Sequence, residues 1–481
     1  MSTSEQSSYQ LVSAVFLRLL GVIYLIAFAS LGVQIEGLVG SQGIIPLGER
    51  LADIALDTGI ERYVQVPTLF WINAGDAVLT GAAGAGCLAA LLIILSIGQR
   101  AALVAAFLLY LSLVHAAQPF LSFQWDTLLL ETGFLAMFLT PRSRALIWLF
   151  RWLLFRLRFM SGLSKLASGD PTWSGLLALN TYFEVQPLPN PAAWYVHQWP
   201  EWLLKIGTGG TLFVELIVPF MMFLPRRWRF TAAWLTILWQ VLIIATSNHN
   251  WINFLTIILC LFLFDDRALK RALPAFMHNR AGWRAASGRT VDLLVPAATG
   301  LLAAVLFVIG TLKIYELGTG HRFEGLTGSV LKYTAVYSIV NKYHVFPTMT
   351  TPRVELEVLG SHDGDNWQPY QFKHKPDRLD ERPTFIIPHQ PRLDWQMWFV
   401  TLHPRHLPWF GSFLEALLEG SPAVSKLLAH NPFPDEPPRY LRVEAHQYNF
   451  TNYAERERTG NWWKRTALGP FMPLPRMERP E

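Results

Sequence analysis

The chain has 481 residues, of which 52% are hydrophobic and only 16% are charged. This much apolar sequence excludes an ordinary soluble protein and predicts an integral membrane protein. The net charge of +5 is modest, and the basic residues lie beside apolar segments, so nothing in the pattern indicates a partner made of nucleic acid.

Apolar segments of about the length that crosses a bilayer fill the first 316 residues. They predict about nine spans, at 11–33, 75–97, 101–121, 124–140, 144–163, 206–224, 229–247, 251–264 and 291–315. The opening MSTSEQSSYQ has no basic region or cleavage site of a signal peptide, so we expect the first span to be retained. Cys87 and Cys260 both lie in apolar segments and form no CxxC motif, which argues against catalysis of disulfide exchange.

The distribution of basic residues predicts the orientation of these spans. With a cytoplasmic N-terminus, twelve basic residues fall in cytoplasmic loops and four in the opposite loops. The cytoplasmic set is Arg100, Arg142, Arg144, Arg226, Arg227, Arg229, Arg267, Lys270, Arg271, Arg280, Arg284 and Arg289. The opposite set is Arg50, Arg62, Lys165 and Lys205. Because basic residues favour cytoplasmic loops, an odd number of spans places the C-terminal region outside the cytoplasm.

Residues 317–481 differ from the transmembrane helical domain predicted for residues 1–316. Alternating apolar and polar residues predict strands at 351–361, 367–375, 382–390 and 439–450, with a hairpin turn at HDGDN (362–366). The segments at 407–420 and 421–430 have helical patterns. We therefore expect a β-rich extracytoplasmic domain, arranged as a sandwich, that carries a helical insertion.

The run FQWDTLLLETGFLAMFLTP, from Phe123 to Pro141, is apolar except for Gln124, Asp126 and Glu131. A carboxylate at membrane depth is costly unless it is paired or faces the protein interior. Gln124 and Glu131 lie on one helical stripe. These residues therefore need polar partners on a neighbouring element.

The next apolar segment offers such partners. It carries a basic residue at every seventh position, and a heptad spacing keeps such residues on one face; the four are Arg144, Arg151, Arg158 and Lys165. Equal counting on both sides of the turn at Pro141 pairs Glu131 with Arg151, and it sets Asp126 near Arg156 and Arg158. Two interpretations remain open: an ion-paired helical hairpin, or a polar pocket that opens outward near Asp126 and Trp125.

Two further segments are candidate partner-binding sites. The rigid, proline-rich NTYFEVQPLPNPAAWYVHQWP carries polar and aromatic side chains that could bind a partner at low entropic cost, namely Glu184, Gln186, Trp194, Tyr195 and His197. RLDWQMWF, with Arg392, Asp394, Trp395 and Trp398, is predicted to sit where the C-terminal domain meets the membrane surface. His403 and His406 are expected at the surface, and the sequence predicts no catalytic residue, metal ligand or cofactor.

Long motifs in collinear order resemble the lipase maturation factor family. They include FQWDTLLLETGFLA, RLRFMSGLSKLASGDPTW, FVELIVPF, VNKYHVFPTMT, PPRYLRVEAHQYNF and GNWWKRTALGPF. The similarity runs from about residue 10 to about residue 475. It implies, in eukaryotes, a protein of the endoplasmic reticulum membrane that assists the folding and dimer assembly of secreted lipases. The compact chain and its two cysteines would also suit a bacterial inner-membrane member.

Two functions therefore follow from the sequence. The first is a membrane-anchored folding factor whose partners are the lipid bilayer and exported lipases or related hydrolases. The alternative is a membrane enzyme acting on a lipid or an exported polypeptide, with a site around Asp126, Glu131, Arg158 and His197.

Overall fold

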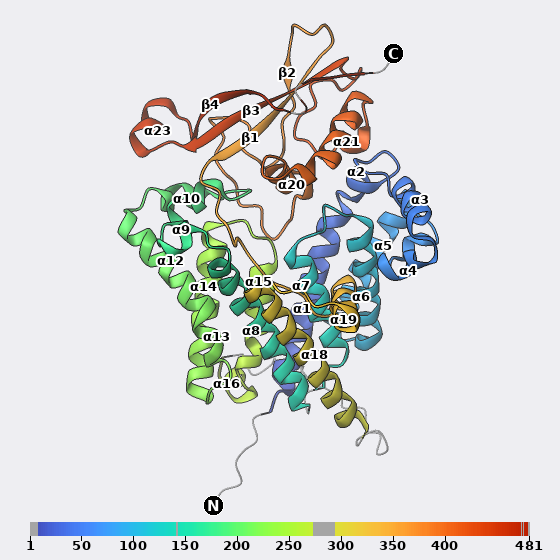
Figure 1. The fold of residues 1–481 in the computed structure, drawn as a ribbon, viewed down its shortest axis with the longest axis vertical. Coiled ribbons are helices and arrows are strands. Elements are labelled where there is room, and N and C mark those ends of the chain that lie inside the picture. Colours follow the sequence, from blue (N-terminus) through green and yellow to red (C-terminus); the bar gives the residue numbers. More distant parts are fainter. Residues whose placement is uncertain (1–7, 141–142, 273–293, 473, 475, 480–481) are drawn as a thin grey trace, which may run out of the picture.

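The computed structural model describes residues 8–140, 143–272, 294–472, 474 and 476–479. Helices form a bundle, and a smaller unit built on one β-sheet lies across one end of that bundle (Figure 1). We call residues 8–336 the bundle, residues 337–352 the connecting segment, and the residues from 353 onward the C-terminal unit. Pro141, Arg142, Arg280, Arg284 and Arg289, which entered the predictions of turn and topology, lie outside the described residues.

Five helices among the described residues are long and apolar enough to cross a membrane. They are α1 (Gln10–Gly32), α5 (Asp76–Leu95), α6 (Gln99–Ala116), α14 (Arg226–Thr246) and most of α18 (Leu294–Thr319). Other helices of the bundle are shorter or carry more charge: α7 (Gln124–Met137), α8 (Arg144–Ala167), α12 (Glu201–Leu216) with α13 (Val218–Met221), and α15 (Ile252–Leu259) with the 3-10 turn Cys260–Leu263. The protein is thus a mostly helical membrane protein, whereas helix length and composition do not establish the predicted nine spans.

Small residues allow the central helices of the bundle to pack closely. A Cβ on Gly86 of α5 would lie 2.2 Å from the ring of Phe28 on α1. A Cβ on Gly133 of α7 would lie 1.9 Å from the hydroxyl of Tyr24, also on α1. Such glycines are typical of membrane helices, where close van der Waals packing replaces the hydrophobic effect as a source of association.

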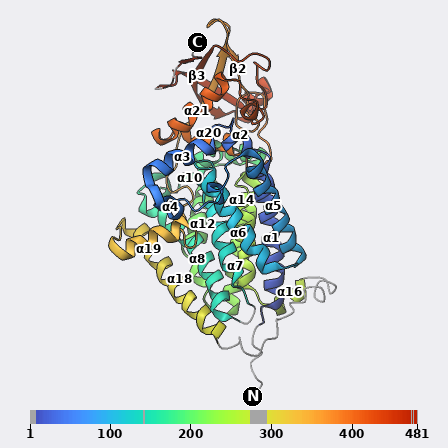
Figure 2. The ribbon, with the colours of Figure 1, turned by 90° about the vertical axis from the view of Figure 1, so that its right-hand side faces the viewer.

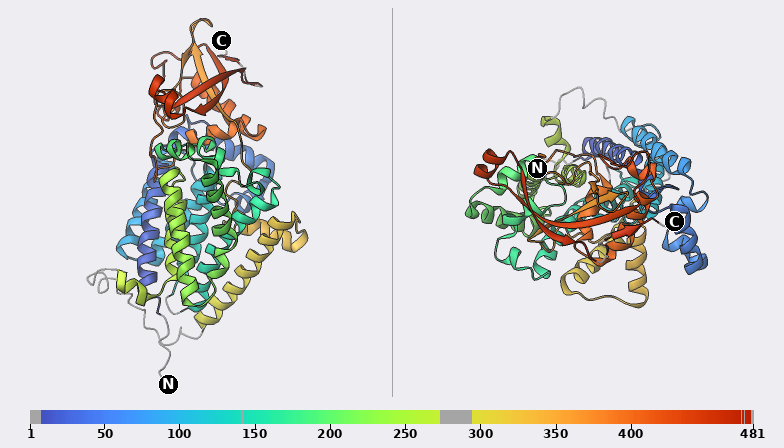
Figure 3. Two further views of the ribbon diagram at one scale, coloured as in Figure 1. Left: turned by 90° about the vertical axis from the view of Figure 1, so that its left-hand side faces the viewer. Right: turned by 90° about the horizontal axis from the view of Figure 1, so that it is seen from above.

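Short helices cover the end of the bundle that faces the C-terminal unit (Figure 2). They are α2 (Ile35–Val39), α3 (Leu47–Thr58), α4 (Arg62–Gln65), α9 (Pro171–Ser174), α10 (Ala178–Val185) and α11 (Pro191–His197). The start of helix α11 is set by two local signals. Pro191 occupies the first turn, and the Asn190 side chain accepts a hydrogen bond from the amide of Ala193 at 3.0 Å. Helix α16 (Asp266–Ala272) lies at the opposite end, and α19 (Gly325–Val336) follows α18 (Figures 1 and 3).

The described residues of the C-terminal unit form one antiparallel sheet rather than the predicted sandwich. Strands β1 (Arg353–Ser361), β3 (Tyr440–Phe450) and β4 (Trp463–Pro470) form most of it, with the short strands β2 (Gln368–Pro369) and β5 (Arg476–Glu478). The strand order is β2-β1-β3-β4, and β5 pairs with β3. The predicted helical insertion lies between β2 and β3, as α20 (Arg392–Val400), α21 (Leu407–Leu418) and α22 (Pro422–Ser425).

Two of the predicted strands are wrong or much shorter than expected. Residues 382–390 form no strand, because Pro383 and Pro388 cannot donate to a ladder and the amide of Ile386 binds the side chain of Asn248 instead, at 3.1 Å. The predicted strand at 367–375 is reduced to β2. The turn at HDGDN is as predicted: the Asp363 carboxylate accepts the amides of Asp365 and Asn366, which lowers the pKa of that carboxyl.

Helix α18 passes the predicted domain boundary at residue 316 and ends at Thr319. Because this helix continues past residue 316, no end of an element marks the predicted boundary. The division into residues 1–316 and 317–481 stays a prediction.

Candidate functional site

The carboxylate of Asp126 on α7 is held by an arginine from the C-terminal unit. Arg392 at the start of α20 donates from Nη1 and Nη2 to the two Asp126 oxygens, at 2.7 and 2.8 Å. Tyr110 of α6 donates its hydroxyl to the same carboxylate at 2.6 Å, and Arg392 also reaches the carbonyl of Phe120 at 3.2 Å. Both charged side chains are fully buried. Because this arginine–carboxylate pair is bidentate and buried away from water, it fixes the orientation of α7 and α20 relative to each other.

Hydrogen bonds from Ser30 in α1 and from Gln34, which precedes α2, extend this contact along the segment that enters α20. The amide of Gln390 donates to Ser30 Oγ at 2.9 Å, and the amide of Arg392 donates to Gln34 Oε1 at 2.8 Å. Gln34 Nε2 donates in turn to the carbonyl of Gln390 at 2.8 Å. The ring of His389 shares Ser30 Oγ through Nδ1 at 2.9 Å. The backbone leading into α20 is thus bonded to the end of α1.

Glu131, one turn further along α7, is surrounded by four donors. Arg156 of α8 forms a buried ion pair with it. From the connecting segment, the Tyr343 hydroxyl donates at 2.7 Å, and the amide and side chain of Asn341 each donate at 3.0 Å. Only 1% of Glu131 is exposed. The predicted partner Arg151 is therefore wrong, although the predicted class of partner, a basic residue on the next helix, is right.

Arg151 binds elsewhere because α7 and α8 are offset along their axes. Its guanidinium donates to the carbonyl of Phe262 at 2.9 Å and to the hydroxyl of Tyr9. Helix α7 ends at Met137, whereas α8 begins at Arg144. At 1.5 Å per residue, Glu131 lies ~9 Å from the end of its helix and Arg156 ~18 Å from the start of its own. Equal counting from the turn assumed no such offset.

The polar stripe predicted on α7 exists, and most of its contacts are with the connecting segment. The amide of His344 donates to Gln124 Oε1 at 2.9 Å, and Gln124 Nε2 donates to the carbonyl of His344 at 2.5 Å. Asn341 also donates to the carbonyl of Thr127 at 3.3 Å. The connecting segment therefore lies along this stripe of α7 and is bound to it by hydrogen bonds.

A third buried carboxylate, Glu215 on α12, brings together two residues of the predicted basic stripe. Lys165 Nζ lies 2.8 Å from Glu215 Oε2, Arg158 Nη2 lies 3.3 Å from Oε1, and the Ser161 hydroxyl donates to Oε1 at 3.1 Å. All four residues come from the facing sides of α8 and α12 and are less than 10% exposed. A cavity of about 310 Å³ adjoins this group.

The first candidate partner-binding segment contacts the C-terminal unit of its own chain. The Glu184 carboxylate accepts the amide of Phe450 at 2.6 Å and the side chain of Asn449 at 2.9 Å. The buried Arg353 of β1 donates to the backbone carbonyls of Glu184 and Gln186, at 2.8 and 2.5 Å. Glu184 and Gln186 thus join α10 to the sheet.

The aromatic residues of the same segment divide between interior and surface. Trp194 is fully buried, with its ring 5.3 Å from that of Trp462. His197 Nε2 lies 3.7 Å from the Glu184 carboxylate. Tyr195 is 38% exposed. Of these residues, Tyr195 is the one best placed to meet another molecule.

RLDWQMWF lies at the junction between the C-terminal unit and the bundle. Trp395 is buried, and its ring stands edge-on to that of Trp125, with centroids 5.1 Å apart. Asp394 accepts the amides of His374 and Lys375, at 2.7 and 3.1 Å, and burial raises the pKa of its carboxyl. The predicted position at the membrane surface stays a prediction, and Trp395 packs against protein.

The two histidines that follow α20 differ in exposure. His403 is exposed as expected, whereas His406 is buried.

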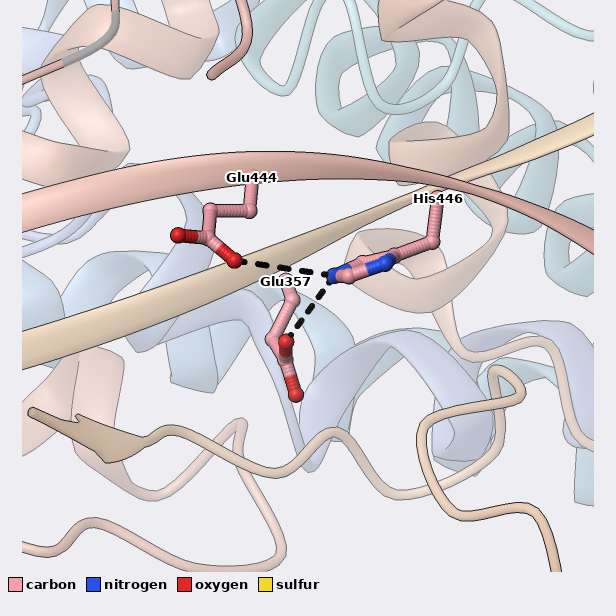
Figure 4. Close-up of side chains that lie close together, drawn as sticks. All are labelled: Glu357, Glu444 and His446. Atoms are coloured by element: carbon pink, nitrogen blue, oxygen red, sulfur yellow. Dashed lines mark hydrogen bonds and ion pairs between the residues drawn. The ribbon is translucent and has the colours of Figure 1, made fainter. Parts of the chain in front are cut away.

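Potential metal ligands converge on the sheet (Figure 4). Among the described residues, one group of three could offer ligand atoms within 4.8 Å of one another: Glu357 of β1 with Glu444 and His446 of β3. His446 Nε2 lies 3.0 Å from Glu357 Oε2 and 3.9 Å from Glu444 Oε2. Arg465 and Arg442 already pair with the two carboxylates, at 3.1 and 3.0 Å. These arginines offset the negative charge that a divalent cation would need, so the group is better explained as an ion-pair network.

The ion pairs and hydrogen bonds at these sites join elements that are distant in the sequence. The carboxylates of Asp126, Glu131 and Glu215 are each buried against at least one cation and one hydroxyl donor. Buried pairs of this kind specify position at little net gain in stability. Fold and site together define a multi-pass membrane protein whose C-terminal unit is fixed to one end of the bundle by buried polar contacts.

Comparison with known proteins identifies the family. Residues 11–271 match the lipase maturation factor transmembrane domain, and residues 339–473 match the lipase maturation factor C-terminal domain. The chain is 33% identical to lipase maturation factor 2 of Xenopus laevis, covering 98% of this chain and 83% of that protein. Lipase maturation factor 1 of Mus musculus is 32% identical, covering 98% and 88%. The chain belongs to the lipase maturation factor family. No solved structure matches it.

Sequence reasoning missed Glu215 and the pairing of Arg392 with Asp126, for different reasons. Glu215 stands inside the apolar FVELIVPF, so the same cost argument that singled out Asp126 would have singled it out. The pairing of Arg392 with Asp126 had no such signal, because 266 residues separate them and no periodicity connects two different folding units.

The geometry around Glu131 predicts a selective energetic coupling. In double-substitution cycles with Glu131→Leu, Arg156→Leu should show a coupling free energy of several kcal/mol, because breaking a buried pair costs about 3–5 kcal/mol and removing both charges costs far less. Arg151→Leu, on the same helix, should show a coupling near zero. Unfolding of the purified protein in detergent measures both. Equal coupling to the two arginines would contradict the assigned pair.

The ring of His389 predicts a pH dependence of the junction. Burial, and then the positive charges of neighbouring groups, lower the pKa of His389 from 6.5 to about 4. Between about pH 6.5 and about pH 4, His389 is protonated in the unfolded chain but still neutral in the folded chain. The free energy of unfolding therefore decreases as the pH falls across this window. His389→Asn should reduce the loss of thermal stability between these pH values, whereas His403→Asn, at an exposed position, should not. An unchanged pH dependence in His389→Asn would contradict the prediction.

Proposed function

We propose that this protein is a membrane-anchored maturation factor for exported or secreted lipases and related hydrolases. The observation that carries the proposal is the collinear match of both family domains, with about one third identity over nearly the whole chain to proteins named lipase maturation factors 1 and 2. The bundle anchors the protein, and the C-terminal unit with the short helices beneath it presents the surface that meets the client.

The buried contacts at the junction support a presenting role. Asp126 with Arg392, and Glu184 with the amide of Phe450, hold the C-terminal unit against the bundle at two separate places. A surface on a fixed body loses less entropy on binding than one on a tethered domain. The client would therefore meet a pre-formed face, on which Tyr195 is one of the exposed aromatic residues.

We further propose the complete topology of nine spans, with the N-terminus in the cytoplasm and the C-terminal unit outside it. It is supported by the position of α16 and the start of α14, which carry many of the basic residues, at the end of the bundle opposite the C-terminal unit (Figure 1). The compartment would be the endoplasmic reticulum in a eukaryote and the inner membrane in a bacterium. A reporter active only in the cytoplasm, fused after Glu481, should give no signal; a strong signal would exclude this topology.

The alternative, an enzyme acting at Asp126 and Glu131, has no comparable support. Both carboxylates are at most 1% exposed and are saturated by donors from the protein itself. His197, the fourth member of that predicted site, contacts Glu184 instead.

Deleting the protein from its source cell should lower the specific activity of exported lipases, measured as activity per amount of lipase antigen. Restoring the wild-type chain should restore it. An exported enzyme outside the lipase and related hydrolase classes serves as the control and should be unaffected. Unchanged specific activity of every exported lipase would contradict the proposal.

A further inference from the structure

The cavity beside Glu215 has a polar end and an apolar body. We call its polar end the part lined by Arg158, Lys165 and Glu215, which contact one another across α8 and α12. The amide side chains of Gln240 and Asn253, from α14 and α15, also line the cavity. The remainder is lined mainly by apolar side chains of α10, α12 and α14. A small polar group set at one end of an apolar pocket is the usual design of a binding site for an amphiphilic ligand.

The charges at the polar end do not balance. Arg158 and Lys165 contribute two positive charges and Glu215 one negative charge, while the other titratable residue lining the cavity, His249, holds the hydroxyl of Tyr182 at 3.0 Å. Lys165 has the shorter contact with Glu215, at 2.8 Å against 3.3 Å for Arg158. Arg158 Nε is buried and has no hydrogen-bond partner among the described residues. An excess buried cation is costly, and a negatively charged ligand group would offset it.

The apolar body of the cavity borders the outer face of the bundle. Ile206 of α12 and Leu242 of α14 line the cavity and are also 62% and 47% exposed. These two helices lie at one edge of the bundle (Figure 1), where the outer face of a membrane protein contacts lipid chains. A ligand could therefore enter sideways from the bilayer with its hydrocarbon chain between α12 and α14.

We propose that this cavity binds a single-chain amphiphile with a negatively charged head group, which Arg158 contacts directly. The volume of about 310 Å³ is at the lower end of the range for ligand pockets, so it suits one hydrocarbon chain rather than two. A fatty carboxylate and a single-chain lysophosphate share the necessary chemistry. The proposal is independent of the lipase client, since it concerns the interior of the bundle.

The test uses the full-length protein in detergent and a fatty carboxylate that carries a photoreactive diazirine in its chain. Labelling should fall on peptides of α12 and α14, and unlabelled oleate or lysophosphatidate should compete. The better competitor identifies the head group. The matched alcohol, oleyl alcohol, should compete at least about tenfold less well, because it lacks the charge-assisted bond to Arg158. Equal competition by the alcohol, or no labelling of either helix, would overturn the proposal.

Two variants separate the charge from the shape of the cavity. Arg158→Gln leaves Lys165 and Glu215 as a neutral pair, so the protein should fold and lose about tenfold or more in affinity for the carboxylate, and little for the alcohol. Ile243→Trp, which narrows the apolar body, should reduce binding of both. Leu238→Trp, at an exposed position of α14 that does not line the cavity, is the matched control and should bind as wild type. Full carboxylate binding by a folded Arg158→Gln would overturn the assignment.

Discussion

The contact between Arg392 and Asp126 determines how the two parts of this protein are combined. An aspartate on an otherwise apolar helix needs a cation, and the cation comes from a part of the chain 266 residues away. Because both side chains are fully buried, neither charge tolerates the loss of the other. Ser30 of α1 and Gln34, which precedes α2, then bind the backbone that leads into α20, so the position of Arg392 is determined from two directions.

Glu131 and Glu215 follow the same rule with different partners. Glu131 is neutralised by α8 and also receives donors from the connecting segment, so that segment becomes part of the bundle. Glu215 is shared by two cations, and a cavity lies beside this group. Asp126 and Glu131 thus join separate parts of the chain. At Glu215, the second cation is available to bind a ligand. Maturation of a client would use the outer surface of the C-terminal unit and the helices beneath it, whereas an amphiphile would bind inside the bundle.

The sequence predicted those features that depend on local chemistry. Apolar segments gave the helices of the bundle, alternation gave β1 and β3, and the cost of buried charge gave the need for a basic partner on α8. It failed where position depends on packing: the offset between α7 and α8 replaced Arg151 by Arg156, and prolines with an Asn248 contact replaced a strand at 382–390. The contacts of Arg392 with Asp126 and of Glu184 with Phe450 join segments that are far apart in the sequence. Local sequence patterns do not predict such contacts.

Hydrogen exchange at the junction tests the central claim most directly, because the amides of Gln390 and Arg392 donate to the side chains of Ser30 in α1 and Gln34 just before α2. In the full-length protein, Arg392→Met should increase exchange at both amides by roughly a hundredfold or more, since it leaves the Asp126 carboxylate buried without its cation. Adding Asp126→Leu should return exchange toward the wild-type rate. Unchanged exchange in Arg392→Met, or a double variant as labile as the sum of both single variants, would contradict the account.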